Sequence, residues 1–229
     1  ADIVCISHTA ALARGTAERV RADLEHGRLA RSEFDAALER IARAKERLTA
    51  PDGGSGTTKE DAEEVRRMLE RSFSLVHGPV PELGERPFFT GCGPVRTSLV
   101  SSHVRETPAF PAYMAEALGG CALVTSDDPD AGEIAAAVQA ARESSCIVLG
   151  TCNAHLKPGQ LALMEALGAL GKPMAVAALR NPYDLLHLPQ GAAGIAAWEY
   201  TARALEALVA FLDKKCRFTG EIPLVYTEF

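Results

Sequence analysis

The sequence lacks the surplus of positive charge typical of nucleic-acid-binding proteins and the long apolar run of a membrane-spanning helix. Acidic residues outnumber basic ones, 30 against 24, and no run of Lys or Arg exceeds two residues. Binding a phosphate backbone requires a surplus of positive charge, so we expect no nucleic-acid partner. The most apolar stretches, such as Met174–Leu179 and Gly191–Trp198, are far shorter than the ~20 residues that span a bilayer. We therefore expect no membrane span.

Metal-binding cysteine patterns are also missing. The six cysteines are scattered, with no C-x-x-C pair and no close Cys/His cluster, so no metal site is predicted. Cys5, Cys121 and Cys146 lie inside or beside apolar runs, where free cysteine packs as a small hydrophobe. These positions favour buried, reduced thiols over a disulfide framework.

The first eight residues carry no basic leader and no cleavage-like site, so no signal peptide is visible. The chain starts without methionine on a strand-like run, which we interpret as the beginning of a fragment or a processed product.

Residues 1–50 predict a β-α-α unit. Asp2–Ser7 is a β-branched apolar run typical of a buried strand, and Leu12–Glu25 has helical spacing. A second helix starts near Ser32 with an apolar stripe of Phe34, Leu38, Ile41 and Leu48. The segment Pro51–Thr58, rich in Gly, Ser and Thr, predicts a linker at 51–58.

Residues 59–229 predict a second domain in which strands and helices alternate. After a helix from Thr58 to Arg71, the expected strands are Phe73–Val76, Pro87–Thr90, Cys121–Thr125, Cys146–Gly150, Pro173–Leu179 and Ala193–Ala197, and the further helices Val95–His103, Tyr113–Leu118, Ala131–Glu143, Gln160–Leu170 and Thr201–Leu212. Strands without polar alternation, separated by such helices, indicate a mostly parallel sheet covered on both faces. The fold class is a doubly wound, three-layer α/β/α domain.

In such a sheet, ligands bind beyond the carboxyl ends of the strands, so the strand-to-helix loops are where a site is expected. Gly91–Pro94 could cradle an anion, but it is neither a full dinucleotide fingerprint nor a phosphate-binding loop, and a simple turn is favoured. Asp127–Asp130 could hold a cation, but an acidic helix start explains the same residues better. Neither segment predicts a cofactor, and we expect none.

Two further loops carry candidate site residues. Cys152 and His155 could form a nucleophilic pair, although no orienting acid is obvious in the sequence. In Arg180–Asp184, Arg180 could bind a carboxylate or phosphate bidentately and Asp184 could hold it in place. The same residues, with Asn181, could instead cap a short helix, and both roles stay open.

The sequence gives weaker support for a site role of His8, Trp198 and Tyr200. His8 follows the first strand and matters only if that strand belongs to a barrel, because barrel active sites open at that end. Trp198 and Tyr200 could stack on a sugar ring, but Trp198, at the end of an apolar strand, is more typical of a core or interface.

These segments together resemble a known family. ADIVCISH, LEHGRL and EFDAALERIARAKERL resemble the last strand and closing helices of the catalytic (β/α)8 barrel in family 3 glycoside hydrolases. GKPMAVAALRNPYDLLHLP, GIAAWEYTARALEALVAFL and FTGEIPLVY resemble that family's second domain, most closely in two-domain bacterial β-N-acetylglucosaminidases. The resemblance covers nearly the whole chain, though residues 78–120 match by position only.

The resemblance implies the C-terminal part of a β-N-acetylglucosaminidase that hydrolyses terminal β-linked N-acetylhexosamine, such as muropeptide-type substrates in peptidoglycan recycling. The family's retaining mechanism uses an aspartate nucleophile and, in this subfamily, a histidine-aspartate acid/base, both on earlier barrel segments. No catalytic residue is therefore assigned here, and no motif carries an acid/base role onto Glu106, Glu165 or Glu199. We expect the chain alone to be inactive.

The resemblance also implies partners and a setting. The expected partners are the N-terminal barrel of a parent enzyme and an amino-sugar glycoside, bound by Arg180, Asn181, Asp184 and His8. The first strand could also pair with a second copy, giving a homodimer. The setting would be the cytoplasm of a bacterium, or its exterior or cell wall. The alternatives are a non-enzymatic carbohydrate-binding or interaction module and an independent enzyme using Cys152 and His155.

Overall fold

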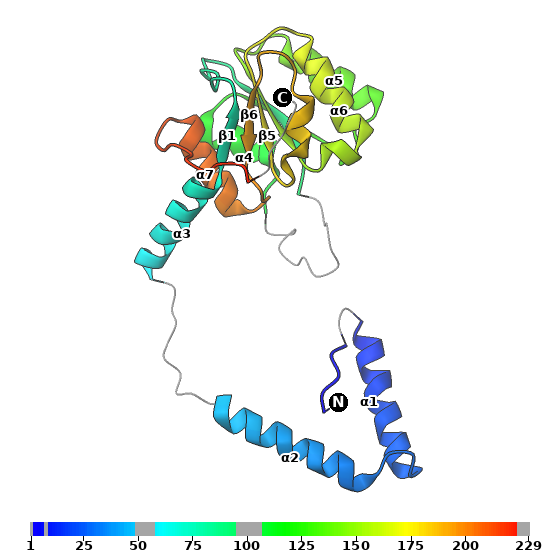
Figure 1. Cartoon of the computed structure of the whole chain (residues 1–229). Coiled ribbons are helices and arrows are strands. Elements are labelled where there is room, and N and C mark those ends of the chain that lie inside the picture. Colours follow the sequence, from blue (N-terminus) through cyan, green and yellow to red (C-terminus); the bar gives the residue numbers. More distant parts are fainter. Residues whose placement is uncertain (1, 7–8, 49–57, 95–106, 224–229) are drawn as a thin grey trace. The chain divides into compact units, whose positions relative to one another are not determined.

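The computed structural model describes residues 2–6, 9–48, 58–94 and 107–223 (Figure 1). The chain divides into two compact units, Ala1–Thr58 and Lys59–Phe229. The predicted helix at Val95–His103, His8, Glu106 and nearly all of the predicted linker 51–58 lie outside the described residues.

The first unit consists of two helices, α1 (Ala10–Glu25) and α2 (Arg31–Leu48). The strand predicted at Asp2–Ser7 was wrong for residues 2–6, which have no regular structure. A strand needs a partner for its backbone N–H and C=O groups, and no other strand lies in the described part of this unit. Both Asp2 carboxylate oxygens instead accept hydrogen bonds from the Arg40 guanidinium, each at 2.7 Å.

Neither helix of the first unit buries a residue. The predicted stripe of α2 is present, but Leu38 and Leu48 are exposed, as are Leu12 on α1 and Ile3 and Val4 before it. Helices of this length are marginal in water without an apolar face packed against something else. The first unit therefore presents apolar surface that its own described residues do not cover.

The second unit is built on a six-stranded sheet with strand order β1-β6-β5-β4-β2-β3. The strands are β1 (Ser74–His77), β2 (Phe88–Cys92), β3 (Cys121–Thr125), β4 (Ile147–Thr151), β5 (Met174–Ala178) and β6 (Ala193–Ala196). All neighbours run parallel except β1, which pairs antiparallel with β6. The predicted mostly parallel α/β sheet is thus confirmed.

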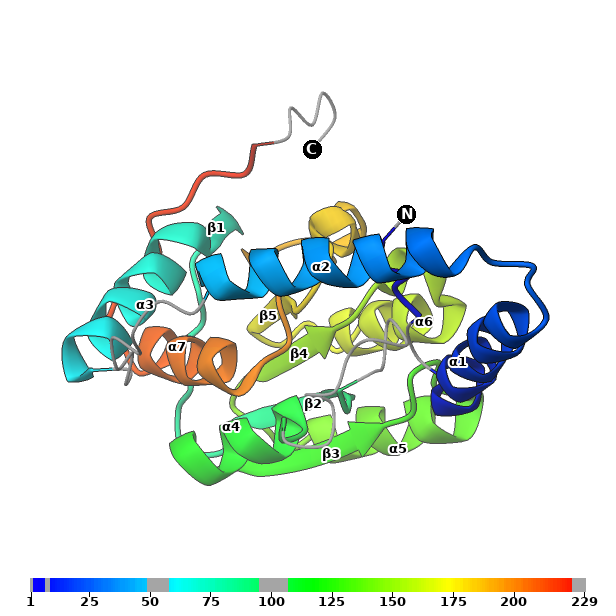
Figure 2. The same cartoon turned by 90° about the horizontal axis from the view of Figure 1, so that it is seen from below.

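Helices cover both faces of this sheet, giving three layers (Figures 1 and 2). The helices are α3 (Lys59–Ser72), α4 (Phe110–Leu118), α5 (Ala131–Ala141), α6 (Pro158–Gly168) and α7 (Ala202–Leu212), with short 3-10 helices η2 (Ala154–Leu156) and η3 (Pro182–His187). α4 and α7 pack on one face, and α5 and α6 on the other.

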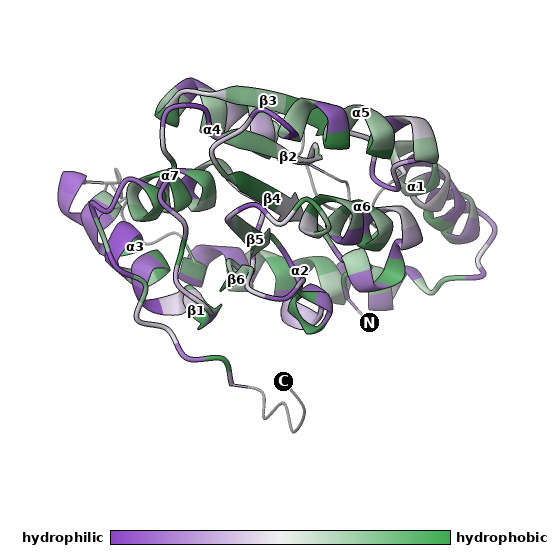
Figure 3. Cartoon of the chain, turned by 90° about the horizontal axis from the view of Figure 1, so that it is seen from above, coloured by the Kyte–Doolittle hydropathy of each residue, from purple (hydrophilic) through white to green (hydrophobic). Residues whose placement is uncertain are grey.

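Alternate residues of the central strands supply the two cores. In β4, Val148 faces the layer of α4 and α7, whereas Ile147 and Leu149 face α5 and α6. Because both faces are covered, all five residues of β4 are buried, and so are those of β5. Figure 3 shows these strands in the colour of hydrophobic residues, whereas α3, which buries no residue, carries much hydrophilic surface.

The cysteine prediction holds only in part. All six are free thiols, and Cys92, Cys146 and Cys152 are buried. Cys5 and Cys121, however, are exposed, contrary to the expectation that they pack as small hydrophobes. Cys121 starts β3, one of the two edge strands, and the first two residues of β3 are open to solvent. Burial raises the pKa of the Cys146 thiol to about 11.

Candidate functional site at the carboxyl edge of the sheet

The carboxyl ends of β2 and β4 form the point at which the chain changes direction across the sheet. β2 connects to β3 on one side of the strand order, and β4 connects to β5 on the other. The helices α4 and α6 that follow β2 and β4 pack on opposite faces. Ligands of doubly wound folds bind at such a switch point. Cys92 ends β2, and Cys152 follows β4 directly.

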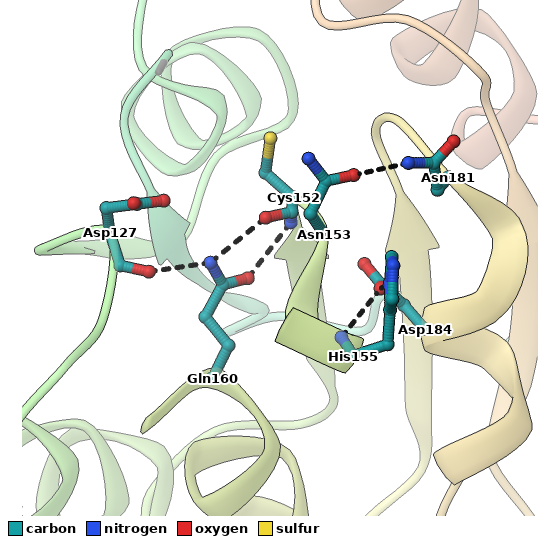
Figure 4. Close-up of polar contacts among 7 residues, drawn as sticks. All are labelled: Asp127, Cys152, Asn153, His155, Gln160, Asn181 and Asp184. Carbon is teal, nitrogen blue, oxygen red and sulfur yellow. Dashed lines mark hydrogen bonds and ion pairs between the residues drawn. The ribbon is translucent and has the colours of Figure 1, made fainter. Parts of the chain in front are cut away.

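Gln160, at the start of α6, joins the segments at this edge (Figure 4). Its Oε1 accepts a hydrogen bond from the Cys152 backbone N–H at 2.9 Å, and its Nε2 donates to the Asp127 carbonyl at 2.7 Å. The same Nε2 lies 3.9 Å from Cys92 Sγ. A buried amide with all these partners fixes the loops after β2, β3 and β4 relative to one another.

The two buried thiols at the switch point influence each other's ionisation. The Cys152 thiol raises the pKa of Cys92, and the Cys92 thiol lowers the pKa of Cys152. Burial raises the pKa of Cys92 further and opposes the lowering at Cys152.

A histidine-aspartate pair lies beyond β4 and β5. His155 Nδ1 is 2.8 Å from Asp184 Oδ1, which also accepts the His155 backbone N–H at 3.1 Å. Asp184 is 0% exposed, and its Oδ2 has no hydrogen-bond partner in the described structure. A carboxylate oxygen accepts hydrogen bonds, so His155 donates to Asp184 through Nδ1.

The surroundings of this pair are polar and aromatic. The His155 side chain is 21% exposed. The centroids of the His155 and Tyr183 rings lie 5.5 Å apart in an edge-to-face arrangement. Asn181 Nδ2 donates to Asn153 Oδ1 at 2.8 Å, and Asn153 has left-handed backbone angles, φ 57° and ψ 41° (Figure 4). Such angles are uncommon outside glycine but are tolerated by asparagine. The site offers an imidazole nitrogen, two amides and an aromatic ring.

The structure revises two of the roles considered for Arg180–Asp184. Asp184 does not hold Arg180: it bonds His155, and Arg180 is exposed. Asn181 precedes η3, but its side chain makes no capping bond and contacts Asn153 instead. The sequence had no orienting acid near His155 because Asp184 lies on the next strand-to-helix loop, 29 residues away. The Cys152–His155 pair is accordingly replaced by the pair His155–Asp184.

The acidic turn after β3 has the structural role that was favoured. Asp130 caps α5 in a capping box with Glu133, whose carboxylate also accepts from the Ser126 hydroxyl and N–H. These bonds, the Ser126 hydroxyl first, lower the pKa of Glu133. Asp128 accepts from the Gly159 N–H at 2.7 Å. Among the described residues no cluster of three or more His, Cys, Asp or Glu side chains could hold a metal ion.

Trp198 and Tyr200 are engaged in the fold. Trp198 Nε1 donates to the Ser72 carbonyl at 2.9 Å, and the ring packs against both cores. The Tyr200 hydroxyl donates to the Cys92 carbonyl at 2.9 Å and accepts the Phe110 N–H at 2.6 Å. Burial raises the pKa of Tyr200, so the phenol stays protonated and tied to the end of β2.

Comparison with known proteins places this fold among glycosidases. No family model and no curated protein matches the chain. Among solved structures, a family 3 β-N-acetylglucosaminidase from Paenibacillus sp. str. FPU-7 aligns at 28% identity and TM-score 0.65, over 88% of this chain and 41% of that one. A fungal multi-domain family 3 β-N-acetylglucosaminidase aligns at 22% identity and TM-score 0.66, over 98% of this chain and 27% of that one.

A β-glucosidase from Listeria innocua shares the fold at 14% identity and TM-score 0.61, over 89% of this chain and 34% of that one. In all three comparisons the chain spans less than half of the similar protein. In the described residues no helix is long and apolar enough to cross a membrane. The alignments confirm the resemblance to family 3 that the sequence predicted. Most of this chain is similar in structure to family 3 β-N-acetylglucosaminidases, and its second unit has the α/β fold of that family's C-terminal domain.

Proposed function

We propose that this chain is the C-terminal portion of a β-N-acetylglucosaminidase that hydrolyses terminal β-linked N-acetylhexosamine, with muropeptide-type glycosides of a bacterium as substrates. The observation that carries the proposal is the similarity to the Paenibacillus β-N-acetylglucosaminidase, at 28% identity over 88% of this chain but only 41% of that enzyme. The catalytic groups are proposed to lie on an N-terminal barrel, so the chain alone is expected to be inactive.

The exposed apolar residues of the first unit support an N-terminal partner domain. Leu12, Leu38 and Leu48 leave much of their surface open, together with Ile3 and Val4. A groove of about 570 Å³ between the N-terminal segment and the two helices is lined by further apolar side chains, among them Val20, Phe34 and Ile41. Exposed apolar side chains grouped around such a groove favour an interface with another protein segment. Residues 1–50 are therefore proposed to close a barrel, with 51–58 as the linker to the α/β domain of 59–229.

The carboxyl edge of the sheet is proposed to contribute to substrate binding. Its chemistry suits a sugar, because amides and an imidazole can bond hydroxyl groups and Tyr183 offers an aromatic ring. Arg180 and Asn181 are proposed to contact the glycoside directly. Asp184 is fully buried, so its proposed role is to orient His155 rather than to touch the sugar. A sugar contact by His8, which lies outside the described residues, stays a prediction from the sequence.

The test compares the longer parent protein with this chain on an aryl β-N-acetylglucosaminide. Release of the aryl group by the parent, with none from residues 1–229 alone, is the expected result. Hydrolysis by the isolated chain would overturn the proposed division of labour. A parent that is no longer than this chain, and that binds N-acetylglucosamine without cleaving it, would instead support a carbohydrate-binding module.

The site assignment needs a separate measurement in the active parent. Arg180→Ala and Asn181→Ala should each raise KM by about tenfold, the value of one to two hydrogen bonds, with a smaller effect on kcat. Arg142→Ala removes an exposed arginine next to the end of α5 and is the matched control. Unchanged KM in both site variants would remove this edge from the substrate site while leaving the proposed activity intact.

A further inference from the structure

Gln160 is a polar side chain at a position of α6 where the pattern of the helix predicts an apolar one. Leu163, Met164 and Leu167 lie three, four and seven residues further along, on the same buried face. Gln160 itself is only 3% exposed. Burying an amide is costly unless its polar atoms are hydrogen-bonded. A glutamine at such a position therefore points to a role that packing alone does not explain.

The Gln160 amide binds the loops that follow β3 and β4 (Figure 4). Its Oε1 accepts from the Cys152 N–H at 2.9 Å, and its Nε2 lies 3.3 Å from the Cys152 carbonyl oxygen, so one side chain bonds both backbone groups of that residue. Nε2 also donates to the Asp127 carbonyl at 2.7 Å, in the loop after β3. The oxygen and the nitrogen of the amide are thus both occupied within the protein, and the buried side chain is withdrawn from any ligand in solution.

The start of α6, which carries this amide, is itself closely packed against the loop after β3. Lys157 Nζ lies 2.6 Å from Asp127 Oδ2, and the Gly159 N–H donates to Asp128 Oδ1 at 2.7 Å. A Cβ at Gly159 would lie 2.2 Å from the Pro129 carbonyl oxygen, so the two backbones approach as closely as only glycine permits. The amide therefore acts from a well-fixed support.

The segment that follows Cys152 connects this support to the loop after β5. Asn153 Oδ1 accepts from Asn181 Nδ2 at 2.8 Å, and His155 Nδ1 lies 2.8 Å from Asp184 Oδ1. Asn153 has left-handed backbone angles, φ 57° and ψ 41°, which persist only where the surroundings hold them. A displacement of Cys152 would therefore move the side chains that hold the loop after β5.

We propose that Gln160 is a positioning residue of the substrate site, which holds the loop after β4 so that Asn153 keeps Asn181 in place. The inference rests on the proposed function, in which Asn181 contacts the glycoside. Gln160 acts through its neighbours and does not touch the sugar. Because the catalytic groups are proposed to lie on the N-terminal barrel, loss of the amide should weaken substrate binding rather than slow the chemical step.

The test replaces Gln160 by methionine in the active parent protein, because methionine has a similar length and no amide. KM for an aryl β-N-acetylglucosaminide should rise about tenfold, the effect of one to two lost hydrogen bonds, and kcat should stay within about twofold. Gln160→Glu keeps an acceptor for the Cys152 N–H, but an ionised carboxylate cannot donate to the Asp127 carbonyl, so KM should rise here as well.

Leu163→Ala is the matched control. Leu163 is buried on the same face of α6 and has only an apolar side chain, so its truncation should lower stability while leaving KM at the wild-type value. A purely structural role of Gln160 would affect KM no more than this control does. Circular dichroism checks that each variant is folded, and Gln160→Glu decides the question if Gln160→Met does not fold.

A second measurement does not depend on activity. Hydrogen exchange followed by mass spectrometry on residues 1–229 should show faster exchange in Gln160→Met for peptides that contain Cys152–His155 and Arg180–Asp184. Peptides of α7, on the other face of the sheet, should exchange as in the wild type.

The outcomes separate this inference from the proposed function. If Asn181→Ala raises KM but Gln160→Met does not, or if Leu163→Ala raises KM equally, Gln160 is not a positioning residue and the proposed function still stands. A parent that does not hydrolyse the glycoside overturns the proposed function instead. In that case hydrogen exchange decides, because wild-type exchange after β4 and β5 in Gln160→Met would show that the amide does not hold these loops.

Discussion

Removing the Asp184 carboxylate should destabilise the α/β unit, because that side chain joins the loops after β4 and β5. In Asp184→Ala, the His155 N–H and Nδ1–H lose their common acceptor. Hydrogen bonds to a charged group contribute about 1.5–3 kcal/mol each, which gives roughly 3–6 kcal/mol for the two. Part is offset because a fully buried carboxylate with one unpartnered oxygen is itself costly. We expect a net loss of about 3 kcal/mol.

Asp184→Asn separates hydrogen bonding from charge. The amide oxygen can still accept from His155, and the buried charge is removed, so unfolding free energy should stay within about 1 kcal/mol of wild type. The assay is urea unfolding followed by the fluorescence of Trp198, the only tryptophan in the chain, which packs against both cores of this unit. Glu165→Ala, an exposed acid on α6, is the control and should change stability by less than about 0.5 kcal/mol.

The thermal midpoint gives a second readout. For a unit of this size, 1 kcal/mol corresponds to about 2–4 °C, so Asp184→Ala should melt about 6–12 °C lower. If Asp184→Ala unfolds at the same urea concentration as Glu165→Ala, the carboxylate does not join the two loops. If Asp184→Asn is as unstable as Asp184→Ala, the negative charge rather than hydrogen-bond acceptance is what matters, and the reasoning above fails.

Three further outcomes test the fold and its charges. Gly91→Ala should lower the free energy of unfolding by about 3 kcal/mol or more, because a Cβ at φ 132° would lie 2.1 Å from the Gly150 carbonyl oxygen. Gly171 also has a left-handed φ, but no atom lies within 4 Å of the added Cβ. Gly171→Ala should therefore cost only about 1 kcal/mol in the same urea assay. Asp130→Ala removes the α5 cap and should lower unfolding free energy by about 1 kcal/mol. Because folding lowers the pKa of Glu133, its ionised carboxylate adds to the free energy of unfolding at pH values above the pKa of the unfolded state. That contribution is lost as the pH falls through the pKa of the folded state. Glu133→Gln should therefore flatten the decline of the urea midpoint as the pH is lowered in the acid range.

Local patterns in the sequence were enough to predict most of the second unit. β3 spans the predicted residues Cys121–Thr125, and β4 and β5 lie within a residue of their predicted bounds, because uninterrupted apolar runs have few alternatives to a covered parallel strand. α5 begins at Ala131, as its acidic cap indicated. The failure was Asp2–Ser7, where an apolar run alone does not supply the neighbouring strand that a β-strand requires.

The candidate site could be predicted only as a set of loops. Parallel strands bring their carboxyl ends to one edge, so the sequence indicated where Cys152, His155 and Asp184 would gather. It did not indicate which side chains would meet. His155 pairs with Asp184 rather than Cys152, because partners are chosen by strand order, in which β4 lies between β2 and β5.

The sequence by itself therefore determined the layers of this protein, since periodicity and caps are local properties that each segment carries alone. Only the tertiary structure decided the pairs: the histidine with its buried aspartate, and the amide that joins three loops. Such pairs join residues 8 to 68 positions apart, whose distances depend on how neighbouring strands are ordered and registered rather than on any segment's own composition.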